Sequence, residues 1–199
     1  YPCPACYKPD TLRLCGVPDN QRQVSFATFD PAPGAEDALL SAQSIATGSA
    51  DFHLALLYGG TGSGKTHLLY SAALAACGRG IFARYFSAVQ LLSDLKARMD
   101  WGEDTPPGSV PYEAFWHQAQ RWPFLCLDGL GDVRHSDLAW SILDELVDTR
   151  YAEGLPLLAA TNLKPEDLPL RMSSRFRDHR HSRLLFLNTP DYRLHHPPP

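Results

Sequence analysis

The sequence predicts an α/β fold in which a parallel five-stranded sheet lies between two layers of helices. Apolar runs alternate with helical patterns along the chain; one run ends in a glycine-rich loop that opens a helix, and another ends in a carboxylate. Alternation of this kind requires right-handed crossovers, which bring the carboxyl ends of the strands to one edge of the sheet. Because ligands of such folds bind at this edge, we expect the functional site there.

The strands are predicted from short, continuous apolar runs bounded by turn residues. Each run is too short for a helix and lacks strict alternation, which is typical of strands buried on both faces. The expected strands are 54–58, 81–86, 124–127, 155–160 and 183–187.

The helices are predicted from apolar residues at helical spacing between these runs. Gly78 closes the second helix, and Ser87 with Gln90 three residues later predicts a capping box at the start of the third. The inner side of this third helix is expected to hold Val89, Leu91, Leu92 and Leu95. The expected helices are 36–46, 65–77, 87–99, 112–120 and 136–152.

Composition excludes several classes of protein. The 199 residues, 44% hydrophobic and 20% charged, fit one globular domain with a small appendage. A formal charge of −4 excludes a polycation, so any contact with nucleic acid requires a local basic patch. No stretch approaches the roughly 18 apolar residues of a membrane span. Five cysteines, an odd number, indicate free thiols in a reducing, cytoplasmic compartment.

The loop 59–66 reads Gly-Gly-Thr-Gly-Ser-Gly-Lys-Thr and matches the phosphate-binding pattern G-x-x-x-x-G-K-[ST] at every position. Its glycines let backbone N–H groups turn toward phosphate oxygens, and the following helix adds the positive end of its dipole. Lys65 is predicted to reach the β- and γ-phosphates, and Thr66 to ligate Mg²⁺. The alternative, a chance glycine loop, does not explain the strand before it and the helix after it. The residues predicted to bind ATP or ADP are Gly60, Thr61, Gly62, Ser63, Gly64, Lys65, Thr66 and His67.

Asp128 ends the apolar run 124–127 and is predicted to hold the same Mg²⁺. The next residue is Gly129, where ATPases with this arrangement usually carry the acid that activates the attacking water. Asp132 is displaced by several residues and could return only through an unusual bend of the loop. The sequence therefore predicts nucleotide binding with slow hydrolysis, or ATP used mainly as an assembly switch.

These motifs and their order resemble the DnaC/IstB group of AAA+ ATPases, which are relatives of the DnaA initiator. The resemblance spans roughly residues 15–194 and implies an AAA+ P-loop NTPase fold without a full C-terminal lid domain. In that group, loaders deliver the replicative DNA helicase to single-stranded DNA, and the IstB branch assists transposases. The segments on which the resemblance rests are Cys15-Gly16-Val17-Pro18, Ser25-Phe26-Ala27-Thr28-Phe29, Gly64-Lys65-Thr66-His67-Leu68, the turn 128–131 and Asp191-Tyr192-Arg193.

The resemblance implies two further catalytic residues. Asn162 stands where AAA+ proteins carry a polar sensor of the γ-phosphate, and its amide could orient the attacking water. The alternative is an N-cap of the next short helix. Arg175, in the segment 171–176, stands where the group carries an arginine finger that reaches the ATP of a neighbouring subunit. Arg171 is the second candidate, and a solvated basic helix is the alternative. A finger in trans implies ATP-dependent self-assembly.

Three cysteines near the N-terminus have the spacing of zinc ligands. Cys3 and Cys6 form a Cys-x-x-Cys pair, and Cys15 follows, but a structural zinc site needs a fourth ligand. A zinc knuckle and free thiols are equal alternatives. We expect an N-terminal extension over 1–35, for which the zinc knuckle is one of these two alternatives, an AAA+ ATPase domain over 36–194 and a disordered, proline-rich tail over 195–199.

The leading functional prediction is an ATP-dependent loader that places a replicative helicase on single-stranded DNA. DNA could bind the five arginines between 171 and 183, or the helix with Lys96 and Arg98, where Tyr85 or Trp101 would stack on bases. The resemblance favours the second place. The alternatives are an IstB-type transposition helper, a small-molecule kinase with an arginine-rich lid, and a nucleotide-regulated scaffold with weak hydrolysis, which Gly129 favours.

Overall fold

The computed structural model describes residues 14–31, 33–101, 106–133 and 136–188. Five parallel strands form one sheet in the order β2-β3-β4-β1-β5, so the predicted parallel five-stranded sheet is confirmed. No helical lid domain follows the last strand within the described residues, which end at Asn188. The strands are β1 (Leu54–Gly59), β2 (Ala83–Ser87), β3 (Phe124–Asp128), β4 (Leu157–Thr161) and β5 (Ser182–Leu187).

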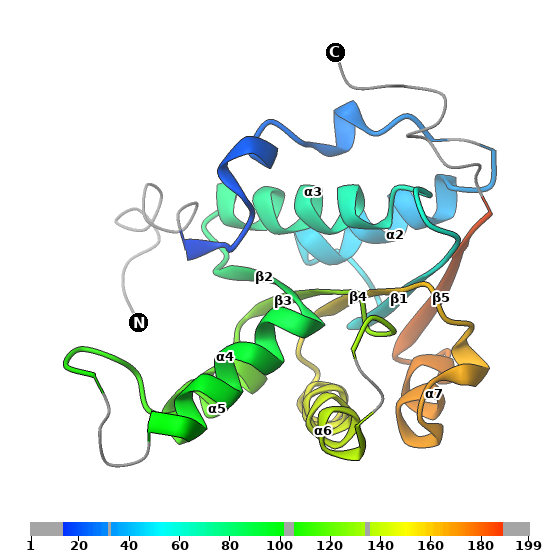
Figure 1. The fold of residues 1–199 in the computed structure, drawn as a ribbon. Helices are drawn as coiled ribbons and strands as arrows, with labels where there is room; N and C mark the ends of the chain where they lie inside the picture. The colour runs from blue at the N-terminus through cyan, green and yellow to red at the C-terminus, as the bar shows by residue number, and fades with distance from the viewer. Residues whose placement is uncertain (1–13, 32, 102–105, 134–135, 189–199) are drawn as a thin grey trace.

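Helices cover both faces of the sheet (Figure 1). Two of them pack on one face and the remaining α-helices on the other, which confirms the predicted layers. Among the helices that the structure describes, none combines the length and the hydropathy of a membrane span. The helices are α2 (Glu36–Thr47) and α3 (Lys65–Gly78) on the first face, and α4 (Ala88–Trp101), α5 (Tyr112–Arg121), α6 (Asp137–Glu153) and α7 (Leu170–Arg177) on the second.

Strand β1 shows why the apolar runs are continuous. Successive side chains of a strand point to opposite faces, so Ala55 and Leu57 enter the core under α2 and α3. Leu54 and Leu56 enter the opposite core under α4 to α7. All four side chains are fully buried, because helices cover both sides of the sheet.

Two predicted strands begin two residues later than expected. The backbone N–H of Ile81 donates to Ala76, and that of Leu155 donates to Arg150, so both residues close the preceding helix. Their apolar side chains made them look like strand residues. β2 therefore starts at Ala83 and β4 at Leu157.

The start of α4 differs from the prediction. The Ser87 hydroxyl accepts the Gln90 N–H at 3.1 Å, as a cap should, but the Gln90 amide donates to Asp94 at 2.6 Å. The reciprocal half of the predicted capping box is therefore wrong. Val89 is 49% exposed, because the face on the core is set by Ala88, Leu91 and Leu95 and Val89 lies about 100° from it around the helix.

A buried arginine on α6 links the connection between α5 and β3 to the connection between α6 and β4. Arg150 is fully buried and donates to the carbonyl oxygens of Gln120, Trp122 and Pro156 at 3.0, 2.8 and 2.6 Å. Burial lowers its pKa to about 9, so the guanidinium stays charged at neutral pH. Nothing in the local sequence pattern marked this residue.

Candidate nucleotide site

The phosphate loop joins β1 to α3 at the carboxyl edge of the sheet. The Lys65 side chain is buried, with 7% exposed, and its ammonium donates to the carbonyl oxygens of Gly59 and Gly60 at 2.9 and 2.7 Å. It also donates to the Ser63 hydroxyl at 3.1 Å. The positive charge therefore lies at the centre of the loop, where a bound phosphate would need it.

The outer side of the loop packs against the segment before α2. Gly64 has φ 90°, and a Cβ there would lie 2.6 Å from the Phe29 ring, so both its conformation and its space require glycine. The Phe29 ring centroid lies 5.4 Å from that of His67, whose Nε2 is 3.0 Å from the Ser25 carbonyl oxygen. His67 thus faces this segment, and its predicted contact with nucleotide stays a prediction.

Thr66 and Asp128 meet although they are far apart in the sequence. The Thr66 hydroxyl donates to Asp128 Oδ2 at 2.7 Å, and the Tyr85 hydroxyl donates to the same oxygen at 3.1 Å. A hydroxyl and a carboxylate side by side are the hard oxygen ligands that Mg²⁺ prefers. The residues present therefore fit the predicted magnesium ion.

Tyr85 supports Asp128 in this arrangement. Burial and the nearby Asp128 charge raise the pKa of the phenol, so it stays protonated and donates. Its ring packs against Tyr70, with centroids 4.6 Å apart. The prediction that Tyr85 stacks on DNA bases therefore gains no support. The pairing of β2 with β3 brings Tyr85 beside the end of β3, which no local pattern indicates.

The loop after Asp128 bends sharply. Gly129 has φ 70°, and the backbone N–H of Asp132 donates to the Gly129 carbonyl at 2.9 Å. A Cβ on Gly129 would lie 2.5 Å from Asp132 Oδ2. The bend that the sequence made look unusual is thus present, and it brings the Asp132 carboxylate beside Gly129.

Asn162 follows the end of β4, next to the loop that carries Asp132, and its side chain is exposed. The N-cap of the next short helix is Lys164, so Asn162 does not cap it. The structure thus removes the alternative role for Asn162, and its role as a sensor stays a prediction.

The arginines of α7 have carboxylate partners within the chain. Arg175 Nε lies 2.8 Å from Asp148 Oδ1, and its guanidinium lies 4.5 Å from the centre of the Tyr151 ring. Arg171 also pairs with Asp148 and lies 3.9 Å from Asp144. Partial burial raises the pKa of Asp148, but the hydrogen bonds from Arg175 and Arg171 outweigh it and hold the pKa below its usual value.

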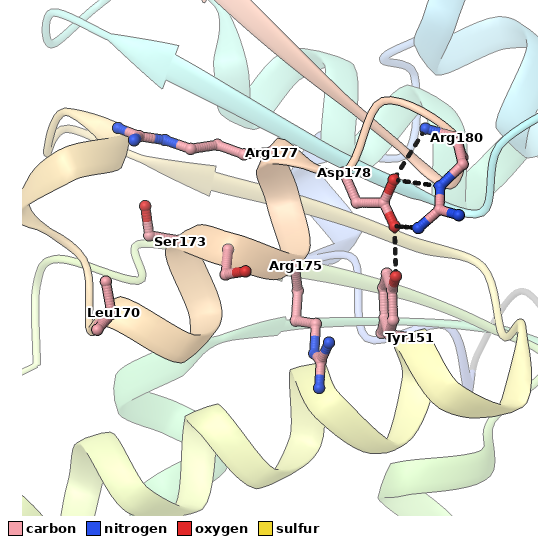
Figure 2. A pocket seen from close by; sticks show the side chains of 8 residues that line it. Tyr151, Leu170, Ser173, Arg175, Arg177, Asp178 and Arg180 are labelled. Atoms are coloured by element: carbon pink, nitrogen blue, oxygen red, sulfur yellow. Dashed lines mark hydrogen bonds and ion pairs between the residues drawn. The ribbon is translucent and has the colours of Figure 1, made fainter.

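A pocket of about 540 Å³ opens beside these pairs. Figure 2 shows Asp178 between Arg180 and Tyr151, while Arg175 extends toward α6. The hydrogen bonds from Arg180 and Tyr151 hold the pKa of Asp178 well below its usual range. The pocket is lined by Tyr151, Leu170, Ser173, Ser174, Arg175, Arg177, Asp178 and Arg180.

Two predictions from the sequence, the DNA-binding helix with Lys96 and Arg98 and the zinc knuckle, gain less support from the structure than the magnesium site does. Lys96 is exposed on α4, but Arg98 donates to the Val110 carbonyl at 2.7 Å and lies over the Phe115 ring. Cys15 is fully buried, and a hydrogen bond with the Cys77 thiol lowers its pKa. Cys3 and Cys6 lie outside the described residues. Elsewhere in the described chain, no group of three or more His, Cys, Asp or Glu is placed to hold a metal, so zinc is not supported.

Comparison with solved structures places the fold among the AAA+ P-loop NTPases. The replication initiator DnaA bound to AMPPCP and single-stranded DNA matches with a TM-score of 0.72 and 20% identity, over 84% of this chain and 50% of that one. The DnaC helicase loader matches at 0.68 and 24%, over 85% and 99%. DnaI matches at 0.69 and 18%, over 91% and 98%. The chain thus spans about half the length of the DnaA chain and almost all of the two others.

The search of curated proteins gave no match. The model of the IstB-like ATP binding protein family matches residues 9–164, well over half of the chain and including the phosphate loop, Asp128 and Asn162. The resemblance predicted from the motifs is confirmed, and the chain belongs to the IstB-like ATP-binding proteins.

Proposed function

We propose that this chain is an ATPase that loads a replicative DNA helicase onto single-stranded DNA and that ATP controls its assembly. The observation that carries the nucleotide part is the meeting of Lys65, Thr66 and Asp128 at one edge of the sheet. The loader part is supported by the coverage of the DnaC helicase loader, 99% of which aligns with this chain. Because the two chains share 24% identity, this likeness establishes a common fold, and the replicative helicase as partner is our proposal.

Each residue of the site has a defined task in this proposal. The backbone N–H groups of the loop and the Lys65 ammonium bind the phosphates. Thr66 and Asp128 hold Mg²⁺, and Tyr85 keeps the Asp128 carboxylate oriented. When bound, the metal neutralises charge that develops on the phosphate oxygens. Asn162 orients the attacking water from the end of β4.

Arg175 completes the site of a neighbouring subunit. Its side chain is 34% exposed beside a pocket on α7, so a partner can reach it. An approaching triphosphate would compete with Asp148 for the guanidinium, and hydrolysis would then require an assembled state. This exchange would couple self-assembly on DNA to ATP binding.

The rate of hydrolysis separates the proposed loader from a nucleotide-regulated scaffold. Position 129 offers no acidic side chain, so turnover is slow unless another acid activates the water. An IstB-type transposition helper is the second candidate function, favoured by the family match. The partner protein separates it from a loader.

The test is to mix the full-length protein with the replicative helicase of its own organism and to measure the masses of the complexes by mass photometry. A heavier helicase complex with ATP, but not with ADP, is the expected result. Self-assembly on DNA without a helicase complex would replace the loader by the transposition helper. No ATP-dependent change in mass would contradict both functions.

A further inference from the structure

We propose that Asp132 supplies the catalytic carboxylate of ATP hydrolysis, from the space that a side chain at position 129 would occupy. This inference rests on the proposed ATPase function. If Asp132 has this role, hydrolysis does not require an acid at position 129, and the slow turnover expected from Gly129 no longer follows.

The geometry of the loop 129–133 carries the proposal. A Cβ built on Gly129 would lie 2.5 Å from Asp132 Oδ2 and 3.2 Å from its Cγ, which is inside van der Waals contact. The carboxyl group of Asp132 thus fills the space in which a side chain at position 129 would begin. Only glycine leaves room for it there.

The surrounding contacts fix the bend that makes this placement. The Asp132 N–H donates to the Gly129 carbonyl at 2.9 Å, and the Leu130 N–H donates to the Ala160 carbonyl of β4 at 3.0 Å. Leu130 and Val133 are buried on either side, while Asp132 is exposed. Two buried anchors and two backbone hydrogen bonds therefore hold the one exposed acid of this turn at the edge of the sheet, beside the end of β3.

The other polar groups at this edge are poorly suited to the task. Asp128 Oδ2 already accepts hydrogen bonds from Thr66 and Tyr85, which fits a metal ligand. The Asn162 amide is neutral and cannot take a proton from water. Asp132 is thus the carboxylate in this loop that remains for a catalytic base.

The reaction balances with water as the only co-reactant. The water oxygen forms a bond to the γ-phosphorus, and the bond from this phosphorus to the β–γ bridging oxygen breaks. ADP leaves with the electron pair of that bond. The Asp132 carboxylate accepts a proton from the water and returns it to the phosphate product or to solvent, so the products are ADP and phosphate.

The test compares Asp132→Asn and Asp132→Glu with the parent in the full-length protein. Asparagine keeps the shape and the turn but removes the base. ATP turnover with single-stranded DNA should fall by about 100-fold in Asp132→Asn, the usual contribution of a general base. Asp132→Glu should keep more turnover than Asp132→Asn. Asp167→Asn, at an exposed aspartate on the short helix 165–167, is the matched control and should hydrolyse ATP like the parent.

Two measurements other than turnover identify a catalytic role. The affinity for ATP, from the fluorescence of a labelled nucleotide, should stay within about threefold of the parent, because binding the phosphates does not need this base. ATP-bound assemblies of Asp132→Asn should persist longer after free ATP is removed, as measured by mass photometry. A residue that only supports the fold would not lengthen their lifetime.

The outcomes distinguish this proposal from the proposed function. If the parent binds ATP and Asp132→Asn keeps turnover within tenfold, the role of Asp132 is overturned and the ATPase remains. If the parent binds ATP but does not hydrolyse it, the role of Asp132 and the proposed ATPase activity both fail, and a nucleotide-regulated scaffold remains. If the parent does not bind ATP, the proposed function itself fails.

Discussion

The phosphate loop and the α6–α7 face both hold cations near a candidate site, but their partners differ. Lys65 is buried and donates to neutral oxygens of its own loop. Arg171 and Arg175 are partly exposed and pair with carboxylates of α6. The loop is thus built to receive a negative ligand, whereas on α7 a ligand must displace a protein carboxylate. We infer that the phosphate loop can bind a nucleotide in a single chain. The arginines of α7 bind a ligand only when a partner subunit displaces their carboxylates.

The largest expected effect tests whether Arg175 acts in trans. Arg175→Ala should lower ATP turnover of the assemblies by about 1000-fold, the usual contribution of an arginine finger, while ATP affinity stays unchanged. Arg177→Ala, in which the exposed pair with Glu166 is lost, is the matched control and should keep turnover. Mixing Arg175→Ala with Lys65→Ala subunits should recover activity, because each supplies what the other lacks. If the mixture does not recover activity, Arg175 acts within its own subunit and not in trans.

The second effect concerns Arg150, which lies on the same helix as Asp148 but is fully buried and donates to three backbone carbonyl oxygens. Arg150→Ala should lower the free energy of unfolding by about 3 kcal/mol, because three carbonyl oxygens lose a donor and a cavity opens. Arg150→Met keeps most of the volume and avoids burying a charge, so its cost should be smaller. Urea unfolding measures both. A loss below about 1 kcal/mol in Arg150→Ala would contradict this account.

The third effect isolates the phosphate loop. Lys65→Ala should weaken ATP binding by about 100-fold, since the triphosphate loses its buried cation. Lys164→Ala, at an exposed lysine beyond β4, should bind like the parent. Isothermal titration calorimetry gives both affinities. Equal affinities would mean that the loop does not bind the phosphates.

The smallest effect concerns the ion pairs between α6 and α7. Asp148→Asn should lower the free energy of unfolding by about 1 kcal/mol at pH 7, because the pairs are partly exposed. The folded pKa of Asp148 is lowered, so this contribution is complete above its unfolded pKa of about 3.9. It should disappear as the pH falls through the folded pKa. A difference between the two proteins that grows toward acid pH would contradict the sign.

Most of the fold followed from local patterns in the sequence. The order of strands and helices, the loop 59–66 and Asp128 at the end of β3 could all be read from spacing and residue type. The errors are also local: apolar side chains predict strands at Ile81 and Leu155, whose backbone N–H groups instead close the preceding helices. Apolar character does not reveal which backbone group an N–H reaches.

The sequence by itself determined that the chain binds a nucleotide with a P-loop fold, because that motif acts through the backbone of eight consecutive residues. Only the tertiary structure decided that Tyr85 supports Asp128, that Asp132 fills the space beside Gly129 and that Arg175 pairs with Asp148. These contacts join residues on different elements or across a bend. They depend on strand order, helix packing and the conformation of single residues, which no pattern of neighbouring residues records.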